Sequence, residues 1–367
     1  MASQFTKKIT DFISFNPLSC RSGSLPGNIV LMVKLMVVGL LMKEYLHDLS
    51  DHFLPFFPVF DQIGSPEEFK SILQFFFILG SVGVLFSRWI RASCLILGLV
   101  FLTAVLSSKF HYTNVKFFCA CIFLLTSMSN SKDPLIFLRF QMVIVYLGAT
   151  VNKIFDADWR SGQYFEHWMS AVLKREVYIH ATTFFPPMVL SKIMCWMSIF
   201  TEFFLTIGFL LKPLQYVTIF VGVYFHSMVF LLASYDFRVF TIAILSSYLI
   251  IVPWPDVLRV RYDDNNQLNR LLKTFFSFVD WDKRIEWQTA RGKWQLGVLE
   301  QSFSGFLAFK RIILYSPFFY FLYVFILGLP NNPYLWIKLK TVQIILVFFF
   351  PWPEIIEHLK GKLRNKK

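Results

Sequence analysis

Residues 187–211 have the sequence PMVLSKIMCWMSIFTEFFLTIGFLL, and a second apolar block, 214–234, follows after Lys212 and Pro213. A helix needs about 20 mostly apolar residues to cross the hydrocarbon core of a bilayer, and both blocks reach that length. Neither block shows the period-two alternation that the strands of a membrane barrel need. The two blocks therefore predict membrane-spanning helices, because only helices and closed barrels can span lipid.

The whole chain has the composition of a membrane protein. Of its 367 residues, 56% are apolar and 16% are charged, whereas soluble domains carry about 25% charged residues. This composition excludes a soluble enzyme, a disordered chain and a disulfide-built secreted module. The five Cys residues contain neither a C-x-x-C pair nor a metal-ligand pattern, so we expect no metal site.

The net charge of +13 is concentrated near the C-terminus, where residues 254–367 hold 17 Lys and Arg against 9 Asp and Glu. No basic and aromatic stripe stands apart from the apolar blocks, so we expect no nucleic-acid partner. A basic tail is typical of a segment that lies against an anionic cytoplasmic leaflet. We therefore expect a multi-pass protein of the cell membrane, with both termini in the cytoplasm and the lipid bilayer as a partner.

The pattern along the chain predicts a cytoplasmic N-terminal segment 1–28, a transmembrane domain 29–253 and a basic C-terminal region 254–367. The predicted fold class is an all-α polytopic membrane protein with about eight transmembrane helices and a small α/β cytoplasmic segment. We expect the longer connections 47–68 and 156–186 to lie outside, since an even number of spans puts both termini on one side. The predicted spans are 29–46, 69–87, 91–107, 113–128, 136–155, 187–211, 214–234 and 239–253.

The C-terminal region mixes polar and apolar stretches. Residues 257–262 predict a strand, 267–279 an amphipathic helix and 284–287 a second strand. The apolar runs 312–329 and 334–350 are either a ninth and a tenth span or helices that lie in the membrane interface or pack on protein. We favour the second interpretation.

Five ionisable side chains inside the predicted spans are informative, because each costs several kcal/mol in lipid unless it is paired or hydrated. We expect Lys116, near a helix end, to snorkel to the membrane surface, while Lys34 either snorkels or turns inward to a partner. Glu202 and His226 lie near mid-span, where a structural role competes with a functional one. In the structural role, Glu202 accepts from Lys34, or His226 bridges two helices. The fifth side chain is Lys153.

Lys153 ends an apolar block and precedes Asp156 and Asp158 at the predicted outer boundary of the membrane. Its spacing alone favours a snorkelling lysine paired with one of these aspartates. The alternative is functional, because a neutral amine in a dry site can act as a base. In that case we expect Lys153, His226 and Glu202 to share one pocket.

A series of polar and aromatic residues surrounds Lys153 in a fixed order: Arg139, Gln141, Tyr146, Ala149, Lys153, Trp159 and Gly162. His226 with Phe240 fourteen residues later, and the early Lys34, extend the series. It resembles the vitamin K-dependent γ-carboxylase membrane domain, which is shared with the horizontally transferred transmembrane (HTTM) family, over about residues 25–253. The resemblance implies that Lys153 deprotonates a vitamin K-like quinol and that His226 is a second catalytic residue. The cofactor-binding residues that it implies are Glu202, Tyr146, Gln141 and Trp159.

The chain departs from the carboxylase pattern in three places. Residues 126–130 lack the histidine that precedes the lysine helix, Phe155 is inserted before Asp156, and the large extracytoplasmic region that grips a propeptide is missing. The resemblance therefore implies a carboxylase-like or quinol-dependent membrane enzyme rather than carboxylation of peptide glutamate.

A second resemblance lies in the C-terminal region, in residues 260–264, 280–281, 285–287 and 305–309. These stretches resemble a thioredoxin-like domain of the D-x-x-C-x-x-C type, which bacterial members of the membrane family carry as a fusion. The cysteine positions fall at about Asn266 and Asn269, so thiol–disulfide exchange there is impossible. The resemblance implies a degenerate, redox-inactive scaffold.

Two functions stay open from the sequence. The first is a membrane enzyme that binds an isoprenoid quinol or similar lipid and uses Lys153 as base, with 156–186 as a lid. The second is a non-catalytic membrane partner that assists maturation or export of a secreted protein or peptide. A transporter ranks third, because no paired broken helices indicate inverted repeats.

Overall fold

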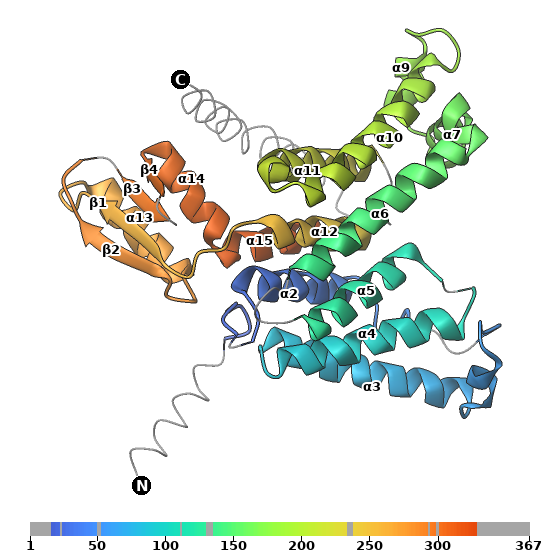
Figure 1. The fold of residues 1–367 in the computed structure, drawn as a ribbon, viewed down its shortest axis with the longest axis horizontal. Helices are drawn as coiled ribbons and strands as arrows, with labels where there is room; N and C mark the ends of the chain where they lie inside the picture. Colours follow the sequence, from blue (N-terminus) through green and yellow to red (C-terminus); the bar gives the residue numbers. More distant parts are fainter. Residues whose placement is uncertain are drawn as a thin grey trace. The chain divides into compact units, whose positions relative to one another are not determined.

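The structure is a computed structural model of the chain, and helices dominate it (Figure 1). It describes residues 16–22, 24–49, 53–110, 112–129, 135–232, 238–292, 294–298 and 301–328. The described elements form two compact units. One unit draws on residues 1–134 and 253–329, and the other draws on 135–252. The predicted division of the chain at residues 28 and 253 stays a prediction.

Four apolar helices build most of the first unit: α2 (Gly27–Met42), α3 (Pro66–Leu85), α4 (Ile90–Ser107) and α5 (Asn114–Met128). A capping box starts α3, in which the Ser65 hydroxyl accepts from the Glu68 amide and the Glu68 carboxylate accepts from the Ser65 amide. Helix α4 packs against both α3 and α5 (Figure 1). Close approach requires glycine here, since a Cβ on Gly98 would lie 2.6 Å from Leu124.

The second unit is built on the packing of α6 (Ile136–Phe155) against α10 (Val189–Leu210). Between them come α7 (Ala157–Ser161), α8 (Gln163–Glu166), the π-helical turn η2 (His167–Val172) and α9 (Glu176–Thr182). After α10 follow η3 (Lys212–Leu214), α11 (Gln215–Leu232), α12 (Arg238–Ser247) and η5 (Tyr248–Ile251).

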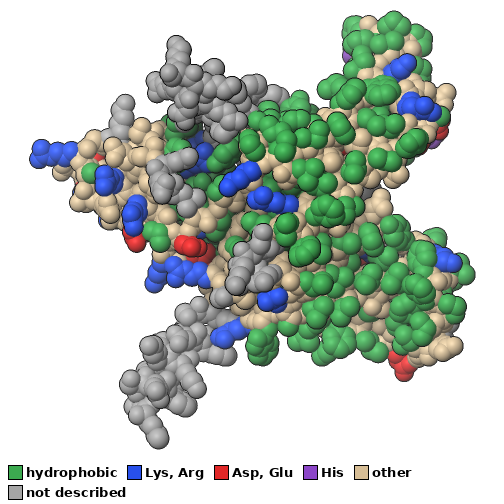
Figure 2. Space-filling model, in the orientation of Figure 1, with side chains coloured by type: hydrophobic (Ala, Val, Ile, Leu, Met, Phe, Trp, Pro, Cys, Tyr) green, Lys and Arg blue, Asp and Glu red, His purple; other side chains and the backbone are tan. Residues whose placement is uncertain are grey.

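The described part of the chain has four helices that are long and apolar enough to cross a membrane: Pro66–Leu85, Ile90–Ser107, Val189–Leu210 and Lys212–Phe230. A fifth is added if the pair Phe306–Tyr315 and Pro317–Ile326, bent by 70°, is one broken span. Figure 2 agrees, because hydrophobic side chains cover the outer surface of α3 and α4 with few charged groups. These helices confirm the prediction of a helical membrane protein.

The predicted number of spans is not confirmed. Apolar helices occur in all eight predicted blocks, but α2 and α5 have only 16 and 15 residues. Helix α6 is 20 residues long, and Arg139, Gln141 and Lys153 lower its hydropathy. The sequence therefore locates the helices, but α2, α5 and α12 (Arg238–Ser247) are too short to count as spans, whereas α3, α4 and α6 are at least as long as their predicted blocks.

The C-terminal part of the first unit is a small α/β segment with a four-stranded mixed sheet of order β2-β1-β3-β4. Strands β1 (Leu258–Tyr262) and β2 (Ile285–Thr289) are parallel and are joined by α13 (Gln267–Val279). Strand β3 (Gln295–Val298) pairs antiparallel with both β1 and β4 (Gln301–Ser304). Helices α14 (Phe306–Tyr315) and α15 (Pro317–Gly328) follow.

The first strand, the helix and the second strand lie where the sequence predicted them, whereas β3 and β4 were missed. They are four residues each and are too short to show a period. The predicted run 312–329 is two helices that meet at Ser316, because Pro317 cannot continue α14. The run 334–350 lies outside the described residues.

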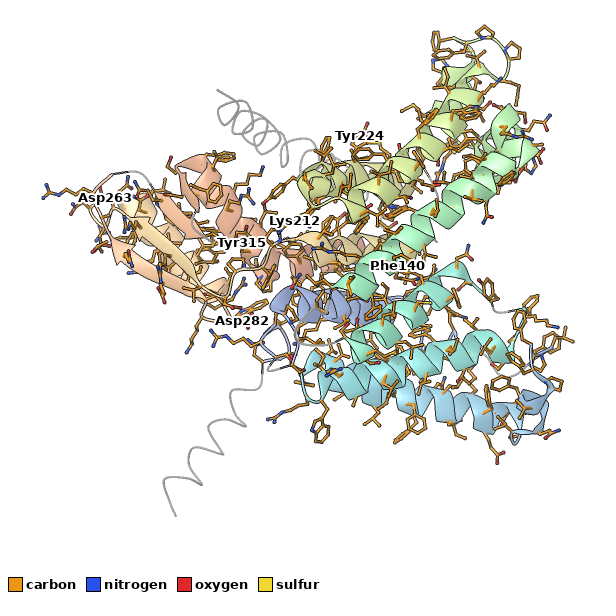
Figure 3. All side chains as sticks on the ribbon, in the orientation of Figure 1. Phe140, Lys212, Tyr224, Asp263, Asp282 and Tyr315 are labelled. Atoms are coloured by element: carbon orange, nitrogen blue, oxygen red, sulfur yellow. The ribbon has the colours of Figure 1, made fainter. Side chains whose placement is uncertain are left out.

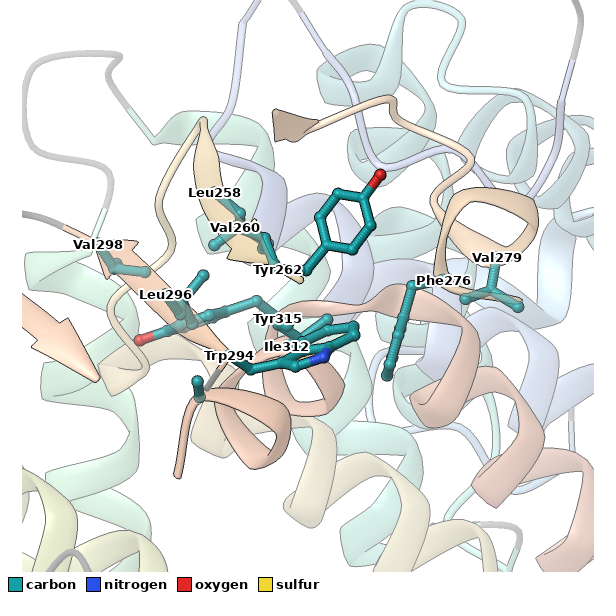
Figure 4. Close-up of a cluster of buried hydrophobic side chains, with 11 residues drawn as sticks. Leu258, Val260, Tyr262, Phe276, Val279, Trp294, Leu296, Val298, Ile312 and Tyr315 are labelled. Atoms are coloured by element: carbon teal, nitrogen blue, oxygen red, sulfur yellow. The ribbon is translucent and has the colours of Figure 1, made fainter. Parts of the chain in front are cut away.

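Helices α13 and α14 cover the same face of the sheet (Figure 4). Strand β1 alternates, so that Leu258, Val260 and Tyr262 point into the core and Arg259 and Arg261 point away from it. The side chains that complete this core are Phe276 and Val279 of α13, Trp294, Leu296 and Val298 at β3, and Ala308, Ile312 and Tyr315 of α14.

Candidate functional site

Lys153 and Glu202 form an ion pair across the packed helices α6 and α10. The Lys153 side chain is 16% exposed and that of Glu202 is 9% exposed, so little water reaches the pair. Lys153 Nζ also lies 3.4 Å from Ser198 Oγ and 4.7 Å from the centroid of the Trp159 ring. Ser198 and Glu202 are four residues apart and therefore lie on one face of α10.

The partner of Lys153 differs from the one that spacing alone favoured. Asp156 caps α7 instead, where its carboxylate accepts from the Asp158 amide at 2.8 Å. Glu202 is not the acceptor for Lys34 either. The fully buried Lys34 donates to the backbone carbonyls of Pro17, at 2.8 Å, and Ser19, at 2.5 Å.

A second cluster joins three buried rings from α6, α11 and η5. The Tyr146 hydroxyl lies 2.8 Å from His226 Nε2 and 2.7 Å from the Tyr248 hydroxyl. The Tyr146 ring stacks on Phe209 of α10, with centroids 5.9 Å apart. The ring of Phe240 lies edge-on to His226, with centroids 6.0 Å apart. His226 therefore does bridge two helices, through a hydrogen bond to Tyr146, whose hydroxyl also bonds that of Tyr248.

In the sequence, Tyr248 stands out only as a hydroxyl group in an otherwise apolar run. The fold positions it tightly, because a Cβ on Gly222 of α11 would lie 1.9 Å from the Tyr248 hydroxyl oxygen. Only glycine leaves room for the ring at that point of α11. Glycine at 222 is thus a second residue of this cluster that sequence reasoning missed.

The two clusters lie along the same packing interface between α6 and α10, called the seam below, which contains Lys153 and Tyr146 of α6 and Glu202 and Phe209 of α10. Lys153 follows Tyr146 by seven residues, which is two helical turns, so the two side chains share a face and are separated by about 10 Å along the axis. Thr150, one turn above Tyr146, donates to the Tyr146 carbonyl at 2.8 Å. Glu202 and Phe209 are likewise seven residues apart on α10. The seam thus carries an ion pair at one level and a tyrosine–histidine chain at the next.

The two other predicted cofactor-binding residues are placed differently. Trp159 of α7 stacks on Tyr164, with centroids 4.5 Å apart, and covers Lys153. Gln141 is half-buried on α6, five residues before Tyr146, which turns it about 140° around the helix from that residue. The structure therefore brings Lys153, Glu202, Trp159, Tyr146 and His226 to the seam and leaves Gln141 off it.

The connection 156–186 folds onto the ends of α10 and α11. Its core consists of Phe165, Met169 and Tyr178 packed on Cys195 of α10. The Tyr178 hydroxyl donates to the Glu166 carboxylate at 2.5 Å, and burial together with that hydrogen bond raises the pKa of Tyr178. This packing holds Trp159 in place beside Lys153.

The first unit contains a different set of buried polar residues. Lys116 does not snorkel: it is buried and donates to the Asp48 carbonyl at 3.1 Å. Asp282, which follows α13 (Figure 3), accepts from the Ser19 hydroxyl at 2.6 Å and from the Cys20 amide at 3.0 Å. Residues 17–20 are therefore held by Lys34 on one side and by Asp282 on the other.

Arg284, two residues after Asp282, is another buried charged residue of the first unit. Its guanidinium donates to the Pro255 carbonyl at 3.1 Å and lies 4.4 Å from the Trp254 ring centroid. Burial lowers the pKa of Arg284, and the nearby Asp282 opposes that effect. These contacts satisfy backbone groups and therefore indicate a structural role.

Among the described residues, no group of three or more His, Cys, Asp or Glu side chains could hold a metal ion. A scan against protein-family models finds no match, and searches of curated proteins and of solved structures find none either. The geometry of the seam between α6 and α10 is therefore the basis for any statement about function.

Proposed function

We propose that the chain is an integral membrane protein of the vitamin K-dependent carboxylase-like (HTTM) family that binds a quinol or a similar lipid beside Lys153. The observation that carries the proposal is the ion pair of Lys153 with Glu202 in a place of low exposure. Trp159 above the pair and the Tyr146–His226 hydrogen bond below it supply aromatic surface and polar groups on the same seam.

The residues present fit a ligand that donates a hydroxyl proton. Among the described residues, Glu202 Oε2 is buried without a hydrogen-bond partner, so an acceptor is available there. A quinol supplies an acidic hydroxyl and an apolar ring. Lys153 becomes a base when its proton passes to Glu202, because the neutral amine then has a free lone pair that can take the hydroxyl proton of the quinol.

A binding and turnover assay on the full chain in lipid nanodiscs tests this function. Vitamin K hydroquinone is the probe, with its oxygen-dependent consumption as readout. We expect Lys153→Arg to abolish consumption, because a guanidinium cannot be deprotonated in a protein. Lys192→Arg, at an exposed position on α10, the helix that carries Glu202, is the control. Consumption by Lys153→Arg at the wild-type rate would refute the role of Lys153.

A non-catalytic function is the alternative, and the pairing of Lys153 supports it. The ammonium already has Glu202, Ser198 and the Trp159 ring as partners, which is the arrangement expected of a purely structural pair. In this proposal the chain assists maturation or export of a secreted protein or peptide. Lys153→Arg would then keep full function, while Lys153→Met would lose stability, so the same variants separate the two functions.

The proposed topology has eight spans in the cell membrane, with both termini cytoplasmic and 156–186 outside. Its support is the basic C-terminal region together with the even number of apolar helices before it. Membrane-impermeant thiol labelling of intact cells tests it. A Ser161→Cys variant should label from outside and an Asn265→Cys variant only after lysis. Labelling of both from the same side would overturn the topology.

We also propose that the α/β segment is a redox-inactive thioredoxin-like scaffold. The supporting observations are the sheet order β2-β1-β3-β4 and the parallel β1–β2 pair joined by α13. Asn266 is the N-cap of α13 and accepts from the amides of Leu268 and Asn269, which is where the first cysteine of a redox pair would stand.

A further inference from the structure

Helix α13 has several apolar side chains that do not pack into the core of the α/β segment. Phe276 and Val279 are buried in that core, whereas four other apolar residues of the helix stay in contact with solvent. The exposed fractions are 60% for Leu268, 66% for Leu271, 42% for Phe275 and 76% for Phe278. Their spacings of three and four residues align them in one stripe along the helix.

This stripe continues into a helix that is apolar enough for the membrane. The ring of Phe275 lies 6.3 Å from that of Phe318 and 6.4 Å from that of Phe319, both in the first turn of α15. Trp281, two residues after α13, lies 5.6 Å from Phe318. Helices α14 and α15 together form the bent pair that is long and apolar enough to cross a membrane, and α15 packs on the apolar helix α2.

The charges on α13 fit an anionic lipid surface. The helix has two basic residues, Arg270 and Lys273, and no acidic residue between Gln267 and Val279. Arg270 is exposed, while Lys273 donates to the Tyr262 hydroxyl at 2.6 Å on the side away from the stripe. A helix with an apolar stripe and a basic polar face is typical of segments that lie in the plane of the bilayer interface.

We propose that α13 lies in the interface of an anionic bilayer, with Leu268, Leu271 and Phe278 inserted among the lipids. A groove on another protein would also accept such a stripe. The continuity with α15 favours the bilayer, because an interfacial helix that adjoins a membrane helix meets lipid without any further partner. The inserted stripe would anchor the α/β segment to the membrane surface, and this role is independent of the chemistry at Lys153.

Depth-dependent fluorescence quenching on the full chain in nanodiscs tests the proposal. An NBD probe is attached at Leu271→Cys, at Phe278→Cys and, as matched control, at Ser277→Cys on the polar face of the same helix. Labelled wild-type chain gives the background from the native cysteines. Nanodiscs with brominated acyl chains should quench the probe at 271 and 278 several-fold more than at 277. Aqueous iodide should show the opposite order.

The outcomes separate the bilayer from the alternatives. Equal lipid quenching at the three positions would overturn the proposal. So would protection of 271 and 278 from iodide without quenching by brominated lipid, since that indicates a protein contact. Quenching at 271 should rise with the fraction of anionic lipid, and a value independent of lipid charge would refute the electrostatic part. An unfolding temperature equal to that of the wild type shows that each labelled variant is folded. We expect this result because all three labelled positions are exposed.

Discussion

Replacement of Lys153 by Met tests whether the buried ion pair stabilises the fold. The substitution removes the ammonium and leaves the Glu202 carboxylate, whose side chain is 9% exposed, without a counter-charge. Removal of one partner of a buried pair costs about 3–5 kcal/mol. Since the Lys153 side chain is still 16% exposed, some water can reach the site. We therefore expect the lower end of this range, about 3 kcal/mol.

The second arm is the double variant Lys153→Met/Glu202→Leu. Apolar residues of similar size can replace a buried pair with little loss or even a gain of stability. We therefore expect the double variant to recover most of the roughly 3 kcal/mol that Lys153→Met loses. The double-mutant cycle should then give a large coupling energy between the two side chains. The control is Lys192→Met on the exposed face of α10, which should change stability by no more than about 0.5 kcal/mol.

Thermal unfolding in a fixed detergent, followed by intrinsic fluorescence, measures these differences. For a chain of this kind, about 3 kcal/mol corresponds to a decrease of several degrees in the unfolding temperature. Two results would refute the reasoning. One is a Lys153→Met variant as stable as the wild type. The other is a double variant whose loss equals the sum of the losses of the single variants Lys153→Met and Glu202→Leu, because the coupling energy is then zero.

Three further predictions concern single elements. Tyr248→Phe removes a buried hydroxyl and leaves Tyr146 with one partner fewer, so it should cost about 1–3 kcal/mol in thermal unfolding; no measurable loss would contradict the hydrogen-bonded chain. The double variant Asn266→Cys/Asn269→Cys should form a disulfide detectable by mass spectrometry, because the two positions lie at the N-cap and third residue of α13; failure to oxidise would argue against the thioredoxin-like arrangement. Because the folded-state pKa of Tyr178 is raised, its contribution to stability is present below the ordinary pKa of about 10 and is lost as pH rises above that value. Tyr178→Phe should therefore flatten the alkaline fall in unfolding temperature, and an unchanged fall would remove this tyrosine as its cause.

The sequence by itself determined the membrane character of the chain and the positions of its apolar helices. It also located β1, α13 and β2 of the α/β segment. These features depend on local properties, which are the hydropathy of about 20 consecutive residues and the period of apolar positions over a few turns. They can be read without knowledge of which segments meet.

Only the tertiary structure decided the partners of the buried polar residues. The sequence required a partner for Lys153 and offered Asp156 or Asp158, whereas Glu202, 49 residues away, occupies that place. Lys34 and Lys116 are satisfied by backbone carbonyls, which every residue carries and no sequence pattern marks. A buried charge must be compensated, but helix packing selects the group that does so, because only packing fixes which side chains face one another.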